Sequence, residues 1–583
     1  MRIEDKASFP RPDFVRENYL SLNGTWQIGF DDSAEPLTPG SLKKELPGRP
    51  ITVPFPYQSP ASGIGDTAVH NKMCYSRPFT LTGEQASQTV LLKFGAVDHK
   101  ALVFVNGSFV GSHTGGYTPF AFDITAFVNE GENALTVWVE DFPSKEQVRG
   151  KQIWDEEPFG CFYTAVSGIW QEVWLEFTGP RYILRVAYET DLEARRVTAR
   201  ILLNAPVTGC IALAVSKAGE PLFTVTRTLR NTDSFAVTFH MEEYGFRDSH
   251  FTNWSPAHPN LFDCDITLTA ENGEDSVSTY FGIRKIAADG DKIYLNNSQI
   301  YLRGVLDQGY WSEGIYRPRT DDGFCEDVEL TLGLGFNMAR KHQKIEDPKY
   351  YYWADRLGLL VWGEMPSFFA YSERAVADSA NTLTEFIERD YNHPCLMAWV
   401  PFNESWGLRM LLGDSRHRDT ARRFYYLCKS KDPSRLVSTN DGWECLTQTD
   451  LAGIHDYRVL GEKLIAYYSN PDFLKSGAAR TGHPYVIPGE NCSGLPLLMT
   501  EFGGRGVKPD ETGRVTEASF DAWKTAITAD VEGVLAIPAF CGYCFTQLTD
   551  VYQEQNGLTD MARRPKADAE ELKALFSRKA KEI

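Results

Sequence analysis

The stretch "AWVPFNESWG", residues 398–407, ends an apolar run with a polar pair, Asn403 and Glu404. An apolar run of this kind fills the centre of a sheet, whereas an amide and a carboxylate are costly to bury without partners. We therefore expect a buried strand that delivers its polar end to a functional site.

After residue 286 the sequence alternates apolar runs with helical segments, for example residues 347–357 and 519–531. Eight strands alternating with helices predict a TIM barrel, in which the functional groups sit at the carboxyl ends of the strands. Asn403 and Glu404 would then lie at the mouth of the fourth strand. The eight runs are "IYLRGV", "FNMARK", "LLVWGEM", "LMAWVPFNE", "LVSTND", "AGIHDY", "LLMTEFGG" and "GYCFTQLT".

The first half of the chain consists of short strands separated by turn residues. "ALTVWVED" alternates apolar and polar side chains with the period of a half-buried strand, and Asn106-Gly107 is typical of a tight hairpin turn. The strand spacing changes after the Gly179-Pro180 turn and then fits a smaller immunoglobulin-like sandwich. We predict a β-sandwich at 1–178, an immunoglobulin-like β-sandwich at 179–285 and the barrel at 286–583.

Composition limits the classes of partner. The 583 residues carry a net charge of −19, which argues against nucleic acid, because affinity for nucleic acid comes mainly from Lys and Arg on phosphates. No apolar run is long enough to cross a membrane, and the acidic N-terminus has no leader pattern, so we expect a cytoplasmic protein. The 11 Cys lack a disulfide framework, and we interpret the Cys541/Cys544 pair as chance spacing.

Several predicted strands end in ionisable groups, and in a parallel barrel these groups converge on one bowl. Two glutamates at strands four and seven would face each other across it. Glycoside hydrolysis with retention needs such a pair, about 5 to 5.5 Å apart, one carboxyl as acid and the other as nucleophile. A lone strand-end Glu is more often a salt-bridge partner, but a matched pair favours catalysis. The groups are Arg340, His342, Glu364, Glu404, His455 to Tyr457, and Glu501.

Other chemistries lack their motifs. The sequence contains no GxSxG, HExxH, Walker A or strand-linked GxGxxG pattern. His342 and His393 lack the spacing of metal ligands, so we expect neither a metal nor an organic cofactor.

The chain resembles glycoside hydrolase family 2, the retaining exo-glycosidases that include β-galactosidases and β-glucuronidases. The resemblance covers nearly the whole chain and implies a sugar-binding jelly roll, an immunoglobulin-like sandwich and a catalytic TIM barrel. It rests on "SLNGTWQIGF", "VFVNGSFVGSHTGGYTPFAFDIT", "SGIWQEVWLE", "NWSPAHPNLFDCDITL", "LGFNMAR", "RDYNHPCLMAWVPFNESWG", "LLMTEFGG" and "NGLTDMARRPK".

The resemblance also implies roles for individual residues. Glu404 matches the general acid/base and Glu501 the nucleophile. Asn403 matches the residue that bonds the sugar 2-hydroxyl, and Tyr457 the tyrosine that bonds the nucleophile. Arg340 and His393 look like supports of the two carboxylates, with pure scaffolding an equal alternative for both.

The sequence departs from the better-known members on the substrate side. Asp307 and Gln308 follow the first barrel strand. After the second strand, His342 stands one residue earlier than the family's usual histidine, and Gln343 occupies the position of that histidine. Phe545 lies near the position of the family's usual tryptophan platform. The Asp307 carboxylate is a candidate either to bond sugar hydroxyls or to cap the following turn. Asp155 and Glu156 are candidates to reach the bowl from the first domain. Trp311, Trp406 and Trp443 are candidates for either stacking or packing.

The lysine with which β-glucuronidases hold a carboxylate is absent before "NGLTDMARRPK", where the residues are "YQEQ". We therefore expect a retaining exo-glycosidase of β-galactosidase-like specificity acting on a glycoside or oligosaccharide. β-Glucuronidase, β-mannosidase and α-L-arabinofuranosidase specificities, or a catalytically silent carbohydrate-binding protein, are the alternatives. We expect no nucleic-acid or membrane partner, and a homo-oligomer stays open.

Overall fold

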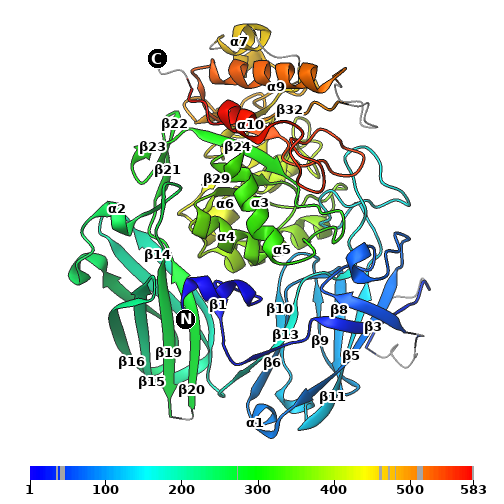
Figure 1. Ribbon diagram of the computed structural model, residues 1–583, viewed down its shortest axis with the longest axis vertical. Helices are drawn as coiled ribbons and strands as arrows, with labels where there is room; N and C mark the ends of the chain where they lie inside the picture. Colours follow the sequence, from blue (N-terminus) through cyan, green and yellow to red (C-terminus); the bar gives the residue numbers. More distant parts are fainter. Residues whose placement is uncertain are drawn as a thin grey trace.

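A computed structural model describes residues 1–33, 37–39, 46, 48–271, 273–458, 462–470, 473–479, 481–507 and 517–580. Figure 1 shows three parts: two β-sandwiches lie side by side at the bottom, and a barrel lies above them. This arrangement confirms the predicted fold class.

The first sandwich packs two antiparallel sheets around one apolar core. The predicted hairpin turn joins β8 to β9, where Asn106 and Gly107 adopt φ of 51° and 77°. One sheet has the order β10 (Phe120–Asp123), β6 (Thr89–Phe94), β13 (Val173–Thr178) and β2 (Tyr19–Ser21). The other has the order β4 (Arg49–Val53), β3 (Gly24–Phe30), β5 (Lys72–Leu81), β11 (Gly131–Glu140), β8 (Lys100–Val105) and β9 (Ser108–Thr114).

The second sandwich is built on a long hairpin of β15 (Arg196–Lys217) and β16 (Glu220–His240). The register of β15 shifts between Leu202 and Val207; its first half pairs with β14 (Ile183–Asp191) and its second half with β19 (Phe262–Ala270). Apolar side chains from both halves form one core.

The N-terminal segment packs against this second sandwich. β1 (Phe14–Val15) pairs with β20 (Gly273–Phe281), and the Met1 ammonium lies 2.8 Å from Asp265 Oδ2. Residues 1–15 therefore contact the second sandwich although they precede the first. The boundaries at 178/179 and 285/286 stay predictions.

All eight predicted barrel strands form, and they are parallel. β29 is extended by β30 (Asn440–Asp441), which pairs with β28 (Phe402–Asn403). The N–H of His455 donates to the carbonyl of Gly442 and so links the last strand of the series back to this region. The order is β29 (Leu436–Val437), β27 (Leu396–Val400), β26 (Leu360–Glu364), β25 (Met338–Lys341), β24 (Leu302–Asp307), β33 (Phe540–Thr546), β32 (Leu497–Gly503) and β31 (Ala452–His455).

Helices surround the barrel, and their ends follow the local sequence. α4 begins at Pro348 because the Asp347 side chain accepts the N–H of Lys349, and it ends where Gly358 adopts φ 83°. Ser519 caps the predicted helix at 519–531 in the same way, and the helix continues to Leu535. The helices are α3 (Asp322–Gly333), α4 (Pro348–Leu357), α5 (Glu373–Asp390), α6 (Ser415–Lys431), α7 (Glu462–Tyr468), α8 (Phe473–Ser476), α9 (Phe520–Leu535) and α10 (Ala569–Phe576).

Short elements complete the chain. They are α1 (Gly83–Ala86), α2 (Ser249–Thr252), β7 (Val97–Asp98), β12 (Gly168–Ile169), β17 (Trp254–Ser255), β18 (His258–Pro259), β21 (Ile286–Asp289), β22 (Lys292–Leu295) and β23 (Ser298–Gln299). Among the described residues, no helix is long and apolar enough to cross a lipid bilayer.

Candidate active site

The two predicted glutamates meet at the carboxyl end of the barrel. Glu404 follows β28, and Glu501 lies in β32. One carboxylate oxygen of each and a ring nitrogen of His455 all lie within 4.8 Å of one another. This separation suits the close carboxyl pair of a retaining glycosidase, about 5 to 5.5 Å, and is too short for an inverting pair.

An unusual backbone presents Glu404 to the bowl. Glu404 and Ser405 have φ of 51° and 58°, a left-handed conformation that costs free energy in residues other than glycine. The Glu404 N–H donates to the carbonyl of Asp441 over 2.9 Å, and the Ser405 N–H donates to Asn440 Oδ1 over 2.9 Å. The pairing of β28 with β30 thus holds the loop of Glu404 and Ser405 in a strained, fixed position.

Arg340 connects the residues around the pair. Its buried guanidinium donates to Asn403 Oδ1 over 2.7 Å and to Glu364 Oε2 over 2.6 Å. It also lies 3.4 Å from Glu501 Oε1. The cation therefore orients Asn403 and faces the Glu501 carboxyl.

His455 stands between three carboxylates. Its Nδ1 lies 2.8 Å from Glu404 Oε1, and its Nε2 lies 3.1 Å from Asp441 Oδ2 and 3.6 Å from Glu501 Oε1. Burial by itself would lower the pKa of His455, but Glu501, Asp441 and Glu404 outweigh it and raise the pKa to about 10. We therefore treat His455 as an imidazolium.

Asp441 balances part of this positive charge. Burial would raise its pKa, but Arg340, 2.6 Å away, and His455 lower the pKa to about 2. Asp441 is thus an anion that holds both cations in place beside the glutamates.

Tyr457 and Thr546 complete the surroundings of Glu501. The Tyr457 hydroxyl donates to Glu501 Oε2 and lies 3.1 Å from Thr546 Oγ1. A hydroxyl donor on one oxygen and a guanidinium near the other hold this carboxyl in one orientation at the barrel mouth.

The trio Glu404, His455 and Glu501 offers donor atoms close enough for a cation. However, an imidazolium has no free lone pair for a metal, and both ring nitrogens of His455 already bond carboxylates. We therefore assign no metal to this trio.

Asp307 and Gln308 are buried and already bonded within the protein. Asp307 Oδ2 lies 2.6 Å from Lys341 Nζ, and its Oδ1 accepts the N–H of Gly309. This matches the turn-capping alternative. Gln308 Nε2 donates to the Tyr163 hydroxyl and to Gln547, while its Oε1 has no partner among the described residues.

One sequence-based assignment was wrong. Phe545 is buried and packs between Phe502 and Phe576 in the layer behind the strands, whereas the next residue, Thr546, faces the bowl. His393 precedes β27, at the opposite end from the bowl, and bonds Asp355, which matches the scaffolding alternative for this residue.

Asp155 is exposed, and its Oδ1 accepts the N–H of Glu156, which is also exposed. That either acid reaches the bowl stays a prediction. The same loop contacts the barrel through Phe162, whose ring lies 5.1 Å from Phe369 and 5.5 Å from Trp406.

His342 and the three tryptophans lie in different surroundings. His342 Nδ1 is 2.9 Å from Glu364 Oε1, but burial, aided by Lys151, lowers its pKa well below the usual value, so we count no ion pair. Trp406 is half-buried in the bowl. Trp443 is buried and stacks on His483, and Arg563 covers Trp311.

The sequence-based prediction missed two residues close to the site, Asp441 and Lys151. Asp441 ends strand five and carried the same strand-end signal as the others. Lys151 lies in a loop of the first sandwich, where no local pattern indicates which side chain reaches the barrel.

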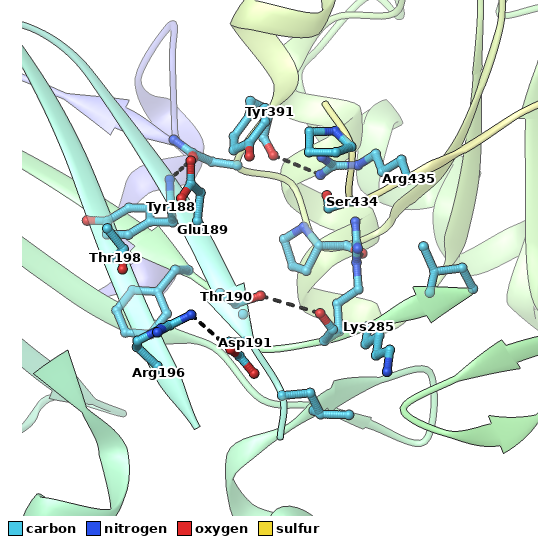
Figure 2. Close-up of a pocket in the computed structure, with 18 of the residues that line it drawn as sticks. Tyr188, Glu189, Thr190, Asp191, Arg196, Thr198, Lys285, Tyr391, Ser434 and Arg435 are labelled. Carbon is cyan, nitrogen blue, oxygen red and sulfur yellow. Dashed lines mark hydrogen bonds and ion pairs between the residues drawn. The ribbon is translucent and has the colours of Figure 1, made fainter. Parts of the chain in front are cut away.

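One cavity lies away from this site. It has a volume of about 600 Å³ and lies between the second sandwich and the barrel (Figure 2). Its charged groups are paired in place, for example Arg196 with Asp191 at 2.9 Å and Lys285 with Glu193 at 2.5 Å. We assign no function to it.

The fold and the paired carboxylates define a glycosidase-type TIM barrel, and comparison with known proteins names the family. Residues 15–179 match the model of the glycosyl hydrolases family 2 sugar binding domain, and residues 286–460 match that of the family 2 TIM barrel domain. The chain belongs to glycoside hydrolase family 2.

Curated relatives carry two kinds of name. A β-galactosidase of Thermoanaerobacter pseudethanolicus is 29% identical over 345 residues, covering 57% of this chain and 44% of the relative. A β-glucuronidase of Paenibacillus borealis is 24% identical over 537 residues, covering 85% and 84%. The matches to the first relatives span less than half of their length.

Solved structures share the architecture from end to end. A β-galacturonidase of Eisenbergiella tayi has a TM-score of 0.75 at 20% identity, covering 99% of both chains. A β-glucuronidase of Bifidobacterium dentium has a TM-score of 0.78 at 20% identity, covering 97% of this chain and 98% of its own. At this identity the likeness establishes the fold.

Proposed function

We propose that this protein is a retaining exo-glycosidase that removes a terminal sugar by double displacement. The observation that carries the proposal is the pair Glu404 and Glu501, with carboxylate oxygens within 4.8 Å at the mouth of a family 2 barrel. The surrounding charges support one role for each glutamate.

Glu501 is the nucleophile. Arg340 lies near one of its oxygens and the Tyr457 hydroxyl bonds the other, so its carboxyl is held in one orientation. In the first step Glu501 attacks the anomeric carbon and forms a glycosyl ester, while the bond to the leaving oxygen breaks.

Glu404 is the acid and then the base. It gives its proton to the leaving oxygen in the first step and takes a proton from water in the second, when the water opens the ester. His455, hydrogen-bonded to Glu404, holds its carboxyl in one orientation through both steps. Asn403, held by Arg340, is placed to bond the sugar 2-hydroxyl.

The sugar is the finer part of the proposal. Sequence-based reasoning favours a β-galactoside, and the relatives' names include both β-galactosidase and β-glucuronidase. Turnover of nitrophenyl galactoside, glucuronide, galacturonide, mannoside, glucoside and arabinofuranoside decides among them. The cytoplasmic location, the absence of an organic cofactor and any homo-oligomer stay predictions.

The test of the reaction is Glu501→Gln, with Glu532→Gln on the exposed face of α9 as the matched control. We expect Glu501→Gln to lower turnover of the best aryl glycoside by several orders of magnitude and Glu532→Gln to leave it unchanged. Near-full activity of Glu501→Gln would overturn the assignment. A wild-type protein that binds sugars but hydrolyses none of the panel would favour the silent carbohydrate-binding alternative.

A further inference from the structure

Lys151 differs from every other buried lysine of the described chain. Six lysines are buried, and five of them lie within 3.5 Å of a carboxylate oxygen: Lys6, Lys72, Lys341, Lys344 and Lys349. Lys151 is only 5% exposed, yet no carboxylate of a described residue lies within 4.0 Å of its ammonium. The ammonium nitrogen itself is not fully shielded from solvent, so an incoming anion can reach it and supply the counter-charge that the described residues do not.

The backbone around Lys151 is fixed against the barrel. The N–H groups of Arg149 and Gly150 both donate to the carbonyl of Ser367, which follows β26. Gly150 has φ 59°, and a Cβ there would lie 2.1 Å from the carbonyl oxygen of Gln343. The Lys151 carbonyl in turn accepts the N–H of Tyr163 over 2.8 Å. The first sandwich therefore holds this residue at the barrel mouth.

Its side chain lies beside the catalytic groups. The Lys151 ammonium is 5.7 Å from the centre of the Trp406 ring, two residues after Glu404, and 5.9 Å from the centre of the Tyr163 ring. Its charge contributes to the lowered pKa of His342, the residue that follows β25. Aromatic faces attract a cation only weakly, so they do not replace an anion.

The nearby acid is committed to other partners. Glu554 is fully buried, and its Oε2 accepts from the Tyr163 hydroxyl and from Gln308 Nε2. Its Oε1 accepts from Asn556 Nδ2. Glu554 stands in the "YQEQ" segment, where sequence-based reasoning found no cation, and the structure brings a cation to the same bowl from the other domain.

We propose that Lys151 binds an anionic group carried by the terminal sugar, either the carboxylate of a hexuronic acid or a sulfate ester. This inference rests on the proposed glycosidase function and gives its substrate class. Such an anion would compensate the buried ammonium, whereas a neutral hexose would leave the ammonium unpaired. The preference for an anionic sugar then lies in one residue of the non-catalytic domain.

The experiment compares kcat/KM for anionic and neutral nitrophenyl glycosides in wild type, Lys151→Met and Lys151→Arg. The substrates are the β-D-galacturonide, the β-D-glucuronide, the 6-sulfo-β-D-galactoside and the plain β-D-galactoside. Lys145→Met is the matched control, since Lys145 is exposed in the same region and lies 5.5 Å from the Trp154 ring.

We expect wild type to prefer one of the anionic glycosides. Whether that substrate is a uronide or the 6-sulfo galactoside shows whether the site binds a carboxylate or a sulfate. Lys151→Met should lower the ratio of anionic to neutral kcat/KM by about 100-fold, mostly through KM, because a desolvated charge loses its partner. Lys151→Arg should retain most of the preference, and Lys145→Met all of it.

Two outcomes separate the inference from the function on which it rests. Hydrolysis of the neutral glycoside with no anionic preference, or an equal loss on all substrates in Lys151→Met, would overturn the role of Lys151 and leave the glycosidase assignment standing. Absence of hydrolysis of every glycoside by wild type would overturn the function itself. If Lys151→Met does not fold, the inhibition of wild type by free galacturonate and by galactose decides the matter: stronger inhibition by galacturonate supports the anion site, and equal inhibition overturns it.

Discussion

His455 lies between the carboxylates of Glu404 and Glu501, the proposed catalytic pair. Its contacts with Glu404, Asp441 and Glu501 raise its pKa although burial opposes the charge. The ordinary value for histidine is about 6.5. A raised pKa in the folded state means that protonation of His455 stabilises the fold.

This predicts a pH-dependent contribution to stability. It is fully present below pH 6.5 and is lost as the pH rises through about 10, the pKa of His455 in the folded protein. The free energy of unfolding of wild type should exceed that of His455→Gln by an amount that shrinks between pH 7 and 10. Urea unfolding of both proteins at several pH values measures it, and a difference that does not vary with pH would contradict the charged His455.

The role of Glu404 predicts a dependence on the leaving group. Glu404→Gln should lower kcat/KM by roughly 10²- to 10⁴-fold for an alkyl glycoside, whose leaving oxygen needs a proton. The loss should be much smaller for a dinitrophenyl glycoside, whose leaving group departs as a stable anion. Kinetics on both substrates test this, and equal losses would show that Glu404 is not the acid.

At the scale of the element, local sequence patterns predicted the barrel strands well. Each strand is an apolar run between turn residues, and "LMAWVPFNE" became β27 and β28 with Glu404 at its end. Phe545 was misplaced because strand side chains alternate, so an error of one residue moves a side chain to the other face. Thr546, the next residue, faces the bowl.

The loop that carries Lys151 depends on Gly150. Gly150→Ala would strain a positive φ and push against the carbonyl of Gln343. We expect this variant to shift the loop and to lower kcat/KM on the preferred glycoside together with the melting temperature. Kinetics and thermal unfolding of the same preparations measure both effects.

Gly160→Ala is the matched control. Gly160 has a similar φ of 54°, but no atom lies within 4 Å of an added Cβ. It should therefore show the strain alone. Equal effects of the two substitutions would contradict the contact between this loop and the barrel.

At the scale of the whole molecule, Arg16 joins the two sandwiches. Its buried guanidinium bonds Glu176 in β13 and Asp275 in β20, with Nη2 2.9 Å from Asp275 Oδ2. Nothing in the local sequence connects these three residues, because the interaction depends on how distant segments dock. For the same reason the sequence left two roles open for His393, whose partner Asp355 lies on a helix at the base of the barrel.

Arg16→Met should therefore destabilise the protein. Two buried carboxylates would lose their shared cation, and breaking a buried ion pair costs about 3 to 5 kcal/mol. The exposed Arg181, whose side chain bonds its neighbour's carbonyl, provides the control Arg181→Met. Chemical denaturation compares the two variants, and an unchanged unfolding midpoint for Arg16→Met would contradict this account of the interface.

The most direct test of the central claim is identification of the covalent intermediate. A 2-deoxy-2-fluoro glycoside of the preferred sugar with a dinitrophenyl leaving group should form the glycosyl ester faster than water opens it, since the leaving group assists only the first step. Peptide mapping by mass spectrometry should then find the fluorosugar on Glu501. A label on Glu404, or turnover with inversion of the anomeric centre and no label, would contradict the proposed mechanism.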